Sequence, residues 1–228
     1  MKDVLRVASV VAVMTASVAL AEDAGTVARD AFDGDLSRWV VEQQPGGTVT
    51  VKDGALVIDD AGGCTVWWRE KLKAPVKISY RAKVTGGERV SDLNCFWMAT
   101  DARTEAQGDF FEKGNGRDGV FAHYDGLKTY YVGCGGNGNT TTRFRRYDGK
   151  GARPLLPEHD RKDKAALLEG GREYRIEIVV TKDGRTTWAR DGVVFFDYAD
   201  PEPLREGWFG LRTVWSRIEV RDFVVERL

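Results

Sequence analysis

One segment, residues 121–147, concentrates the side chains of this sequence that could do chemistry: a histidine, several tyrosines and a cluster of arginines. A guanidinium holds a carboxylate through two parallel hydrogen bonds, and neutralising that carboxylate makes the proton on the adjacent carbon more acidic. A neutral histidine or a tyrosinate could then remove this proton while a tyrosine protonates the departing oxygen. These residue types therefore fit β-elimination on a carboxylated substrate, a reaction that requires no metal ion.

In this scheme His123 is the catalytic base, Tyr131 is the acid, and Arg143 and Arg145 hold the carboxylate. We expect His123 to lie on a strand, where its side chain is on the same face as the side chains two positions before and after it. Strand alternation also places Arg143 and Arg145 together on one face of their own segment. The alternative interpretation is that Arg145 faces solvent on an outer strand and that His123 is a hydrogen-bonded wall residue.

The segment that contains Asp92, Asn94 and Trp97 extends this candidate binding site. Trp97 offers an aromatic ring against which a sugar could stack, Asp92 and Asn94 offer polar contacts, and Tyr130 of the first segment is a further candidate for contact with the substrate. A cap at the end of a strand explains Asn94 equally well.

The segments that must position these residues read as short β-strands joined by tight turns. Residues 174–179 alternate between apolar and polar side chains, which is the period of a half-buried strand. Asp183-Gly184 and Asp191-Gly192 supply two hairpin turns, because an Asp-Gly pair readily adopts the positive φ angles that such turns need. Consecutive short strands with no helix between them restrict the fold to a β-sandwich or a barrel.

The last strand, residues 217–228, is expected to place Ile218 on one face and Phe223 on the other, with a bulge at the two valines that follow. Near the other end of the chain, Phe32 and Trp39 are expected to pack against this final hairpin. Two long stretches, residues 101–119 and 149–171, show neither the apolar period of a helix nor that of a strand. Such loops in a compact domain are commonly functional or disordered.

Length and composition predict one exported domain. Residues 1–21 combine a basic start, an apolar run and a small-residue cleavage site, the pattern of a signal peptide, and residues 22–228 fit a single domain. No later segment has the apolar length of a membrane span, so we expect a mature protein without one, secreted or periplasmic in a bacterium. A retained membrane anchor is the alternative. A net charge of −1 without a basic stripe argues against a nucleic-acid partner.

No cofactor is expected, apart from a structural calcium ion that loop carboxylates and amides could hold. The two histidines, His123 and His159, lie in separate segments, which does not match the ligand spacing of a zinc site. The three cysteines, Cys64, Cys95 and Cys134, cannot all pair with one another. A disulfide and buried free thiols both fit an exported protein.

The order of motifs in the C-terminal half resembles concanavalin A-like jelly rolls. After the two Asp-Gly turns come FFDY, DPEPL, GWFGLR and SRIEVRDFVVERL, an arrangement similar to the end of the 3-keto-disaccharide hydrolase family. Residues 123–147, HYDGLKTYYVGCGGNGNTTTRFRRY, are similar to uncharacterised bacterial jelly-roll proteins associated with rhamnogalacturonan degradation. These resemblances imply an all-β antiparallel sandwich, a jelly roll, that binds an oligo- or polysaccharide on the concave face of one sheet.

The same resemblances imply an exported carbohydrate-active protein that cleaves a glycosidic bond by β-elimination. Its substrate would be a saccharide that contains a uronic acid or a 3-keto sugar, in which the ketone acidifies the neighbouring proton. Asp92 and Asn94 occupy the position of one motif strand of the 3-keto-disaccharide hydrolases. The alternative is a non-catalytic carbohydrate-binding module, or an accessory protein of a polysaccharide-degrading system.

Overall fold

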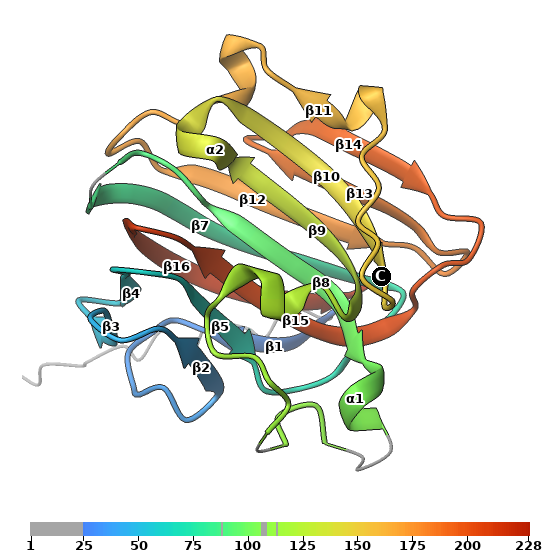
Figure 1. The fold of residues 1–228 in the computed structure, drawn as a ribbon, viewed down its shortest axis with the longest axis horizontal. Helices are drawn as coiled ribbons and strands as arrows, with labels where there is room; N and C mark the ends of the chain where they lie inside the picture. Colours follow the sequence, from blue (N-terminus) through green and yellow to red (C-terminus); the bar gives the residue numbers. More distant parts are fainter. Residues whose placement is uncertain (1–24, 88, 106–108, 113) are drawn as a thin grey trace, which may run out of the picture.

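The computed structural model describes residues 25–228, apart from 88, 106–108 and 113. Over this range the chain forms two eight-stranded antiparallel sheets that pack face to face, with short helical turns between some strands (Figure 1). The antiparallel β-sandwich predicted from the sequence is confirmed. No helix in the described part of the chain is long and apolar enough to cross a membrane. The expected signal peptide, residues 1–21, lies outside the described residues.

Sheet A has the strand order β14-β13-β12-β7-β16-β4-β3, and β1 pairs with β16 beside this path. Its strands are β1 (Thr26–Asp30), β3 (Thr48–Lys52), β4 (Ala55–Asp59), β7 (Val76–Gly87), β12 (Tyr174–Val180), β13 (Arg185–Arg190), β14 (Val193–Ala199) and β16 (Ser216–Arg227). The two predicted Asp-Gly turns join β12, β13 and β14 as consecutive hairpins.

Sheet B has the order β11-β10-β9-β8-β15-β5-β2, and β6 pairs with β15. Its strands are β2 (Trp39–Gln43), β5 (Cys64–Trp68), β6 (Leu72–Lys73), β8 (Asn94–Asp101), β9 (Leu127–Gly135), β10 (Thr141–Asp148), β11 (Asp160–Arg161) and β15 (Glu206–Thr213). The short helical turns are α1 (Ala102–Glu105), η1 (Phe121–Tyr124), α2 (Gly136–Asn139), η2 (Pro157–His159) and η3 (Lys164–Ala166).

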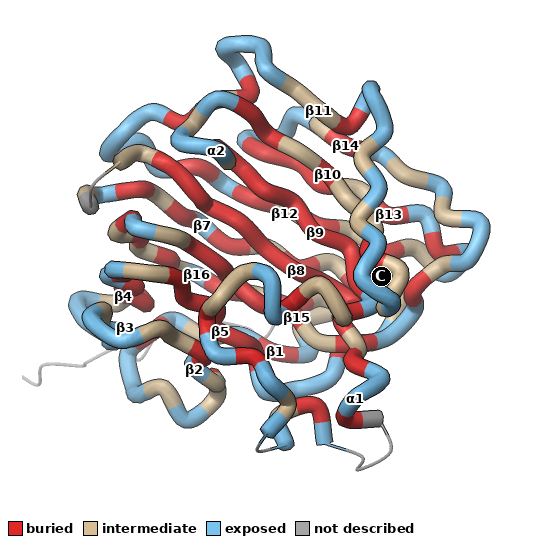
Figure 2. The backbone as a smooth tube through the Cα atoms, in the orientation of Figure 1, coloured by how far each residue is buried: buried red, intermediate tan, exposed pale blue. Residues whose placement is uncertain are grey.

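Two separate apolar clusters stabilise these layers. The main core fills the space between the sheets and includes Ile178 of β12 and Val132 of β9. A second cluster, containing Trp67 and Phe96, lies on the opposite, outer face of sheet B. Strands β8 and β9 are therefore buried on both faces, whereas β12 alternates between buried and more exposed residues (Figure 2). Each large apolar side chain buried in this way contributes about 1.5–3 kcal/mol.

Strand β16 contains a bulge, as the sequence predicts, but the bulge lies before the two valines and not at them. Its pairing with β7 shifts in register between Arg221 and Val224, and Asp222 there has a φ angle of 50°. The prediction for Phe223 is wrong, because its ring joins Ile218 in the core between the sheets. A bulge adds one residue to a strand, so the alternation resumes with the opposite phase.

The N-terminal aromatic residues close the same end of the core, as predicted. The ring centroid of Trp39 lies 5.0 Å from that of Phe223 and 5.8 Å from that of Phe32. All three cysteines are buried and free.

Candidate functional site

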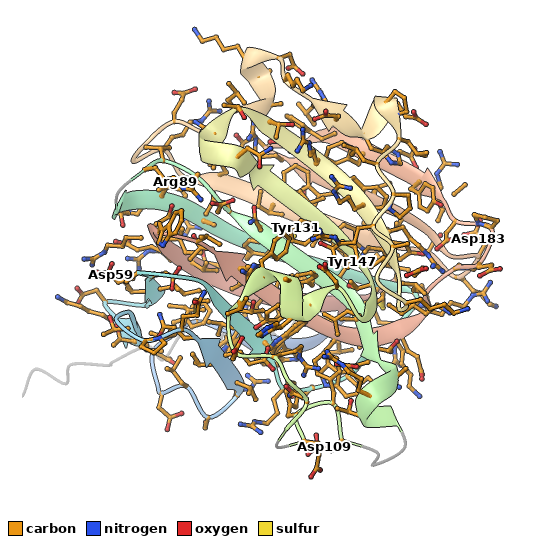
Figure 3. The ribbon with its side chains drawn as sticks, viewed as in Figure 1. Asp59, Arg89, Asp109, Tyr131, Tyr147 and Asp183 are labelled. Carbon is orange, nitrogen blue, oxygen red and sulfur yellow. The ribbon has the colours of Figure 1, made fainter. Side chains whose placement is uncertain are left out.

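A cavity of about 370 Å³ lies on the outer face of sheet B. Tyr131 of β9 and Tyr147 of β10 line it, together with Arg89 from the segment before β8 (Figure 3). The neighbouring side chains along the same strands, Tyr130 and Phe144, point the other way, into the core between the sheets. Strand alternation thus gives this part of sheet B one apolar face and one polar face.

The pairing of β9 with β10 brings the predicted acid and the predicted carboxylate clamp together. Arg145 lies directly opposite Tyr131, and Arg143 lies opposite Gly133. All four residues line the cavity. A Cβ atom at Gly133 would lie 3.2 Å from the Tyr131 ring, so this glycine leaves room above the cavity floor.

Five arginines line the cavity, but its lining includes only one carboxylate, that of Asp92. Three of the five have an acidic partner, at nitrogen–oxygen distances of 2.8–2.9 Å: Arg89 with Asp92, Arg143 with Asp160, and Arg153 with Asp125. The other two, Arg145 and Arg212, form no ion pair with any residue that the structure describes. The cavity therefore contains an excess of positive charge.

Among the described residues, the hydrogen-bond partners of Arg145 and Arg212 are all neutral groups. Arg145 donates a hydrogen bond to the carbonyl of Arg153. Arg212 is almost fully buried and donates to Thr65 Oγ1 at 2.9 Å and to the carbonyl of Gly119 at 3.0 Å. Burial lowers the pKa of Arg145, and the nearby positive charges of other arginines contribute to the same shift. Each guanidinium therefore lies where an anion would be stabilised.

Several polar atoms around the cavity have no hydrogen-bond partner among the described residues. They include Arg89 Nε, Asn94 Oδ1 and Arg212 Nε, all of which are buried. Such atoms are uncommon in folded proteins, because a buried polar group without a partner typically costs about 1–3 kcal/mol. Their concentration around one cavity distinguishes this region from the rest of the fold.

The tyrosines of the cavity are protonated at neutral pH. Burial raises the pKa of Tyr147 to about 12 and holds the pKa of Tyr131 well above its ordinary value of 10. Tyr131 is therefore suited to donate a proton, and poorly suited to act as a base.

Asp92 and Asn94 also line the cavity and hold each other in place. Asn94 Nδ2 donates to Asp92 Oδ1 at 3.1 Å, and Ser91 Oγ donates to Asp92 Oδ2 at 2.9 Å. The structure thus brings together Asp92, Asn94, Tyr131, Arg143 and Arg145 from the residues singled out in the sequence.

His123 does not belong to this group. The segment predicted as a strand forms the 3₁₀ turn η1, and the imidazole is 47% exposed with Nδ1 2.8 Å from Asp118 Oδ1. It does not line the cavity. The prediction of a strand failed because alternate spacing over so few residues also fits one turn of a 3₁₀ helix.

The predicted substrate contacts of Trp97 and Tyr130 are also wrong, because both rings lie in the core between the sheets. Trp97 Nε1 donates to Thr186 Oγ1 at 2.9 Å, and the Tyr130 hydroxyl donates to Asp200 Oδ2 at 2.8 Å. The two residues face each other across β8 and β9. They lie on the correct strands but on the face opposite the cavity.

Three arginines of the cavity, Arg89, Arg153 and Arg212, were not identified from the sequence. Arg212 carries a recognisable signal, since it is a charged residue that directly follows the run WFGL within strand β15. Arg89 and Arg153 lie in turn segments, where an arginine is ordinary and the sequence gives no signal.

A second part of the outer face of sheet B, over β5 and β8, is covered by a loop, residues 109–112 and 114–126, which we call the covering loop. Its side chains Phe110 and Tyr124 pack onto Trp67, with ring centroids 5.1 and 6.3 Å apart. Beneath it, Arg117 forms buried ion pairs with Glu42 and Asp101. Burial raises the pKa of Glu42, although Arg117 opposes this shift. The buried charges of Arg117, Glu42 and Asp101 thus all have partners.

No group of three or more His, Cys, Asp or Glu side chains that could hold a metal ion occurs among the described residues. The carboxylates at the cavity instead pair with arginines, as Asp92 and Asp160 do.

The comparison with protein families identifies the chain. Residues 58–223 match the family described as Domain of unknown function (DUF6250). The chain belongs to this family. A search among curated proteins found no match to this DUF6250 protein.

Solved structures share the fold of this DUF6250 protein. A protein of unknown function with a galectin-like fold from Bacillus subtilis is 16% identical over 90% of this chain and 97% of its own, with a TM-score of 0.69. The carbohydrate-binding module CBM66 from Bacillus subtilis is 13% identical over 83% of this chain and 95% of its own, with a TM-score of 0.52. LamA from Z. galactanivorans, in complex with laminaritriose and laminaritetraose, is 12% identical over 90% and 99%, with a TM-score of 0.54. The DUF6250 chain thus shares the galectin-like jelly-roll fold of these structures.

Proposed function

We propose that this protein binds an acidic saccharide, one that contains a uronate, in the cavity on the outer face of sheet B. The observation that carries the proposal is the pair of guanidiniums, Arg145 and Arg212, that have no carboxylate partner in a cavity lined by five arginines. Two of the structural neighbours support a saccharide ligand, because one is a carbohydrate-binding module and the other was solved with bound laminarin oligosaccharides.

The physical argument rests on charge. An unpaired charge in a partly desolvated site is unfavourable, and a ligand carboxylate would offset it while accepting two parallel hydrogen bonds from one guanidinium. Arg145 has donors left for this purpose, since its one hydrogen-bond partner in the described part of the chain is the Arg153 carbonyl. Phe121 and Tyr131 add aromatic rings to the lining, against which the C–H face of a sugar could pack. Export directed by residues 1–21 would bring the protein to such saccharides.

Binding is favoured over cleavage because the cavity provides no evident base. His123 points away to Asp118, and Asp92 already pairs with Arg89. No histidine is among the residues that line the cavity.

β-Elimination is the second candidate function, and the position of Tyr131 favours it. Its hydroxyl has no hydrogen-bond partner in the described part of the chain, and it lies across from Arg145, where a clamped uronate would place the bond to be broken. Its raised pKa suits the role of the acid that protonates the departing oxygen. The proton on the adjacent carbon would then have to pass to a group of the substrate or to water.

Calorimetric titration tests the binding proposal. Four ligands are titrated into the wild type, Arg145→Gln and Arg185→Gln. They are trigalacturonate, its neutral counterpart with reduced carboxyl groups, a sulfated trisaccharide without carboxylates, and a 3-keto disaccharide. Arg185 is the matched control, because it pairs with Asp197 on the exposed part of sheet A. We expect saturable binding of the uronate by the wild type and the control, and its loss in Arg145→Gln.

Equal binding of the acidic and the reduced trisaccharide would overturn the proposal. Preference for the sulfated sugar would mean that the cavity recognises a sulfate ester and not a carboxylate. Preference for the 3-keto disaccharide would mean that the ligand is a 3-keto saccharide. Tyr131→Phe separates the two candidate functions: under elimination it abolishes the unsaturated product while binding persists, whereas under pure binding the wild type forms no such product.

A further inference from the structure

We infer that the cavity takes the end of a saccharide chain and excludes an internal stretch of polymer. This inference rests on the proposed function and narrows its ligand. It follows from the way in which two segments close the outer face of sheet B around the cavity.

The first closure is the covering loop. Trp67 and Phe96, on the outer face of β5 and β8, have no exposed surface. Tyr124 lies over both of them, with its ring centroid 5.8 Å from Phe96 and nearly parallel to it, and Phe110 packs edge-on against Trp67. A polysaccharide that crossed all the strands of sheet B would need this surface, and the protein's own aromatic residues occupy it.

The covering loop is anchored by ion pairs that are costly to break. Arg117 has no exposed side-chain surface and bridges Glu42 of β2 to Asp101 of β8, with its Nε 3.1 Å from Glu42 Oε1. It also donates a hydrogen bond of 2.6 Å to the carbonyl of Phe110 within the loop. Moving the loop aside would leave Glu42 buried without a counter-charge and would remove one of the two arginines that pair with Asp101, so the loop is a fixed wall.

The second closure lies at the end of the cavity near Tyr147. Arg153, from the turn after β10, forms an ion pair of 2.9 Å with Asp125 at the end of the covering loop. Its guanidinium also lies 5.4 Å from the ring centroid of Phe121 and 5.8 Å from that of Tyr147. The two loops thereby meet over the strands and close this end.

Arg89 and Asn137 border the opposite end of the cavity, and no hydrogen bond between described residues joins them. A ligand would therefore enter between the segment before β8 and the turn α2. Because Arg153 closes the end near Tyr147, the cavity can hold the terminal sugar of a chain, while the remainder of the chain extends into solvent.

Titration with galacturonate oligomers of increasing length tests this inference. From the monosaccharide to the hexasaccharide, we expect the affinity to level off at the disaccharide. The number of protein molecules bound to one long polymer chain should depend on its ends and should not increase with its length. An affinity that rises through the hexasaccharide, with several proteins on each long chain, would overturn the inference. No binding at any length would overturn the proposed function, and this inference with it.

Two modifications sharpen the experiment. An oligomer whose reducing end is reduced to the alditol, and one whose non-reducing end is blocked, should differ by tenfold or more in affinity, because only one end enters. Equal affinity of both for the wild type would contradict end binding. The variant Arg153→Ala opens the closed end, so the affinity for the trisaccharide should rise several-fold relative to that for the disaccharide. The variant Arg185→Ala should leave the ratio of these two affinities unchanged.

Discussion

The outer face of sheet B contains two buried arginines whose surroundings differ in one respect. Under the covering loop, Arg117 pairs with two carboxylates, those of Glu42 and Asp101. In the cavity, Arg212 is equally buried but its guanidinium meets only a hydroxyl and a carbonyl, with the rings of Phe121 and Tyr124 beside it. Burial alone therefore does not distinguish a structural charge from a binding charge; the presence of a carboxylate partner does.

The physical reason is the free energy of an unpaired charge. A buried ion pair satisfies both of its members, so removing one member destabilises the fold. A buried charge without a partner is already unfavourable, and a protein retains it where a ligand supplies the missing partner. The two halves of this face should therefore respond in opposite ways to the same kind of substitution.

The largest effect is expected under the covering loop. Arg117→Met leaves Glu42 buried without a counter-charge and Asp101 with Arg103 as its remaining partner, and we expect the free energy of unfolding to fall by about 3–5 kcal/mol. Urea denaturation followed by tryptophan fluorescence measures it. The control Arg185→Met removes an exposed pair with Asp197 and should cost less than about 1 kcal/mol. Equal losses in the two variants would remove the distinction between the halves.

The cavity should show the reverse pattern. Arg145→Met removes a charge that has no carboxylate partner, so the free energy of unfolding should change by less than about 1 kcal/mol. The same variant should weaken binding of a uronate by about 2–5 kcal/mol, roughly 30-fold or more in Kd. Urea denaturation and calorimetric titration measure the two effects. A large loss of stability with unchanged affinity would make Arg145 a structural residue.

A smaller effect is expected from His159, which lies in neither half. Its ring packs edge-on against Phe144 and near Tyr198, and burial lowers its pKa below the ordinary 6.5. The unfolded chain thus takes up this proton at a higher pH than the folded chain. The contribution of the neutral His159 ring to the free energy of unfolding is therefore complete above pH 6.5 and is lost as the pH falls below that value.

The variant His159→Gln isolates this contribution, because other titrating groups are common to both proteins. The difference in unfolding free energy between wild type and variant should shrink as the pH is lowered through 6.5. A difference that stays constant across this range would show that the imidazole titrates alike in both states.

The smallest effect is expected from His123→Ala. The imidazole is half exposed and contacts Asp118 outside the cavity, so uronate affinity and any turnover should be unchanged. Titration and an assay for unsaturated product measure them. Loss of activity in this variant would restore His123 as the base predicted from the sequence.

Sequence reasoning succeeded where strand alternation alone decides the outcome. Tyr131, Arg143 and Arg145 lie on regular, directly paired strands, so their common face follows from the period of two. It failed for Trp97 and Tyr130, because a strand buried on both faces gives no sign of which face is the outer one. For His123 it failed because a single turn imitates the strand period.

The covering loop could not be predicted, because its position depends on contacts between distant residues. Arg117 meets Glu42, which lies 75 residues earlier in the chain, and local sequence carries no information about such a pair. The same holds for Arg212, whose place in the cavity depends on which strands flank β15 in sheet B. The fold class follows from local patterns, whereas the shape of the site follows from long-range packing.

The central claim is that the guanidiniums of Arg145 and Arg212 bind a carboxylate of the ligand. A crystal structure with bound digalacturonate tests this claim most directly. The account predicts the sugar in the cavity beside Tyr131, with its carboxylate accepting hydrogen bonds from Arg145 or Arg212 at about 2.7–2.9 Å. A sugar bound elsewhere on the molecule, or bound in the cavity with its carboxylate turned to solvent, would contradict it.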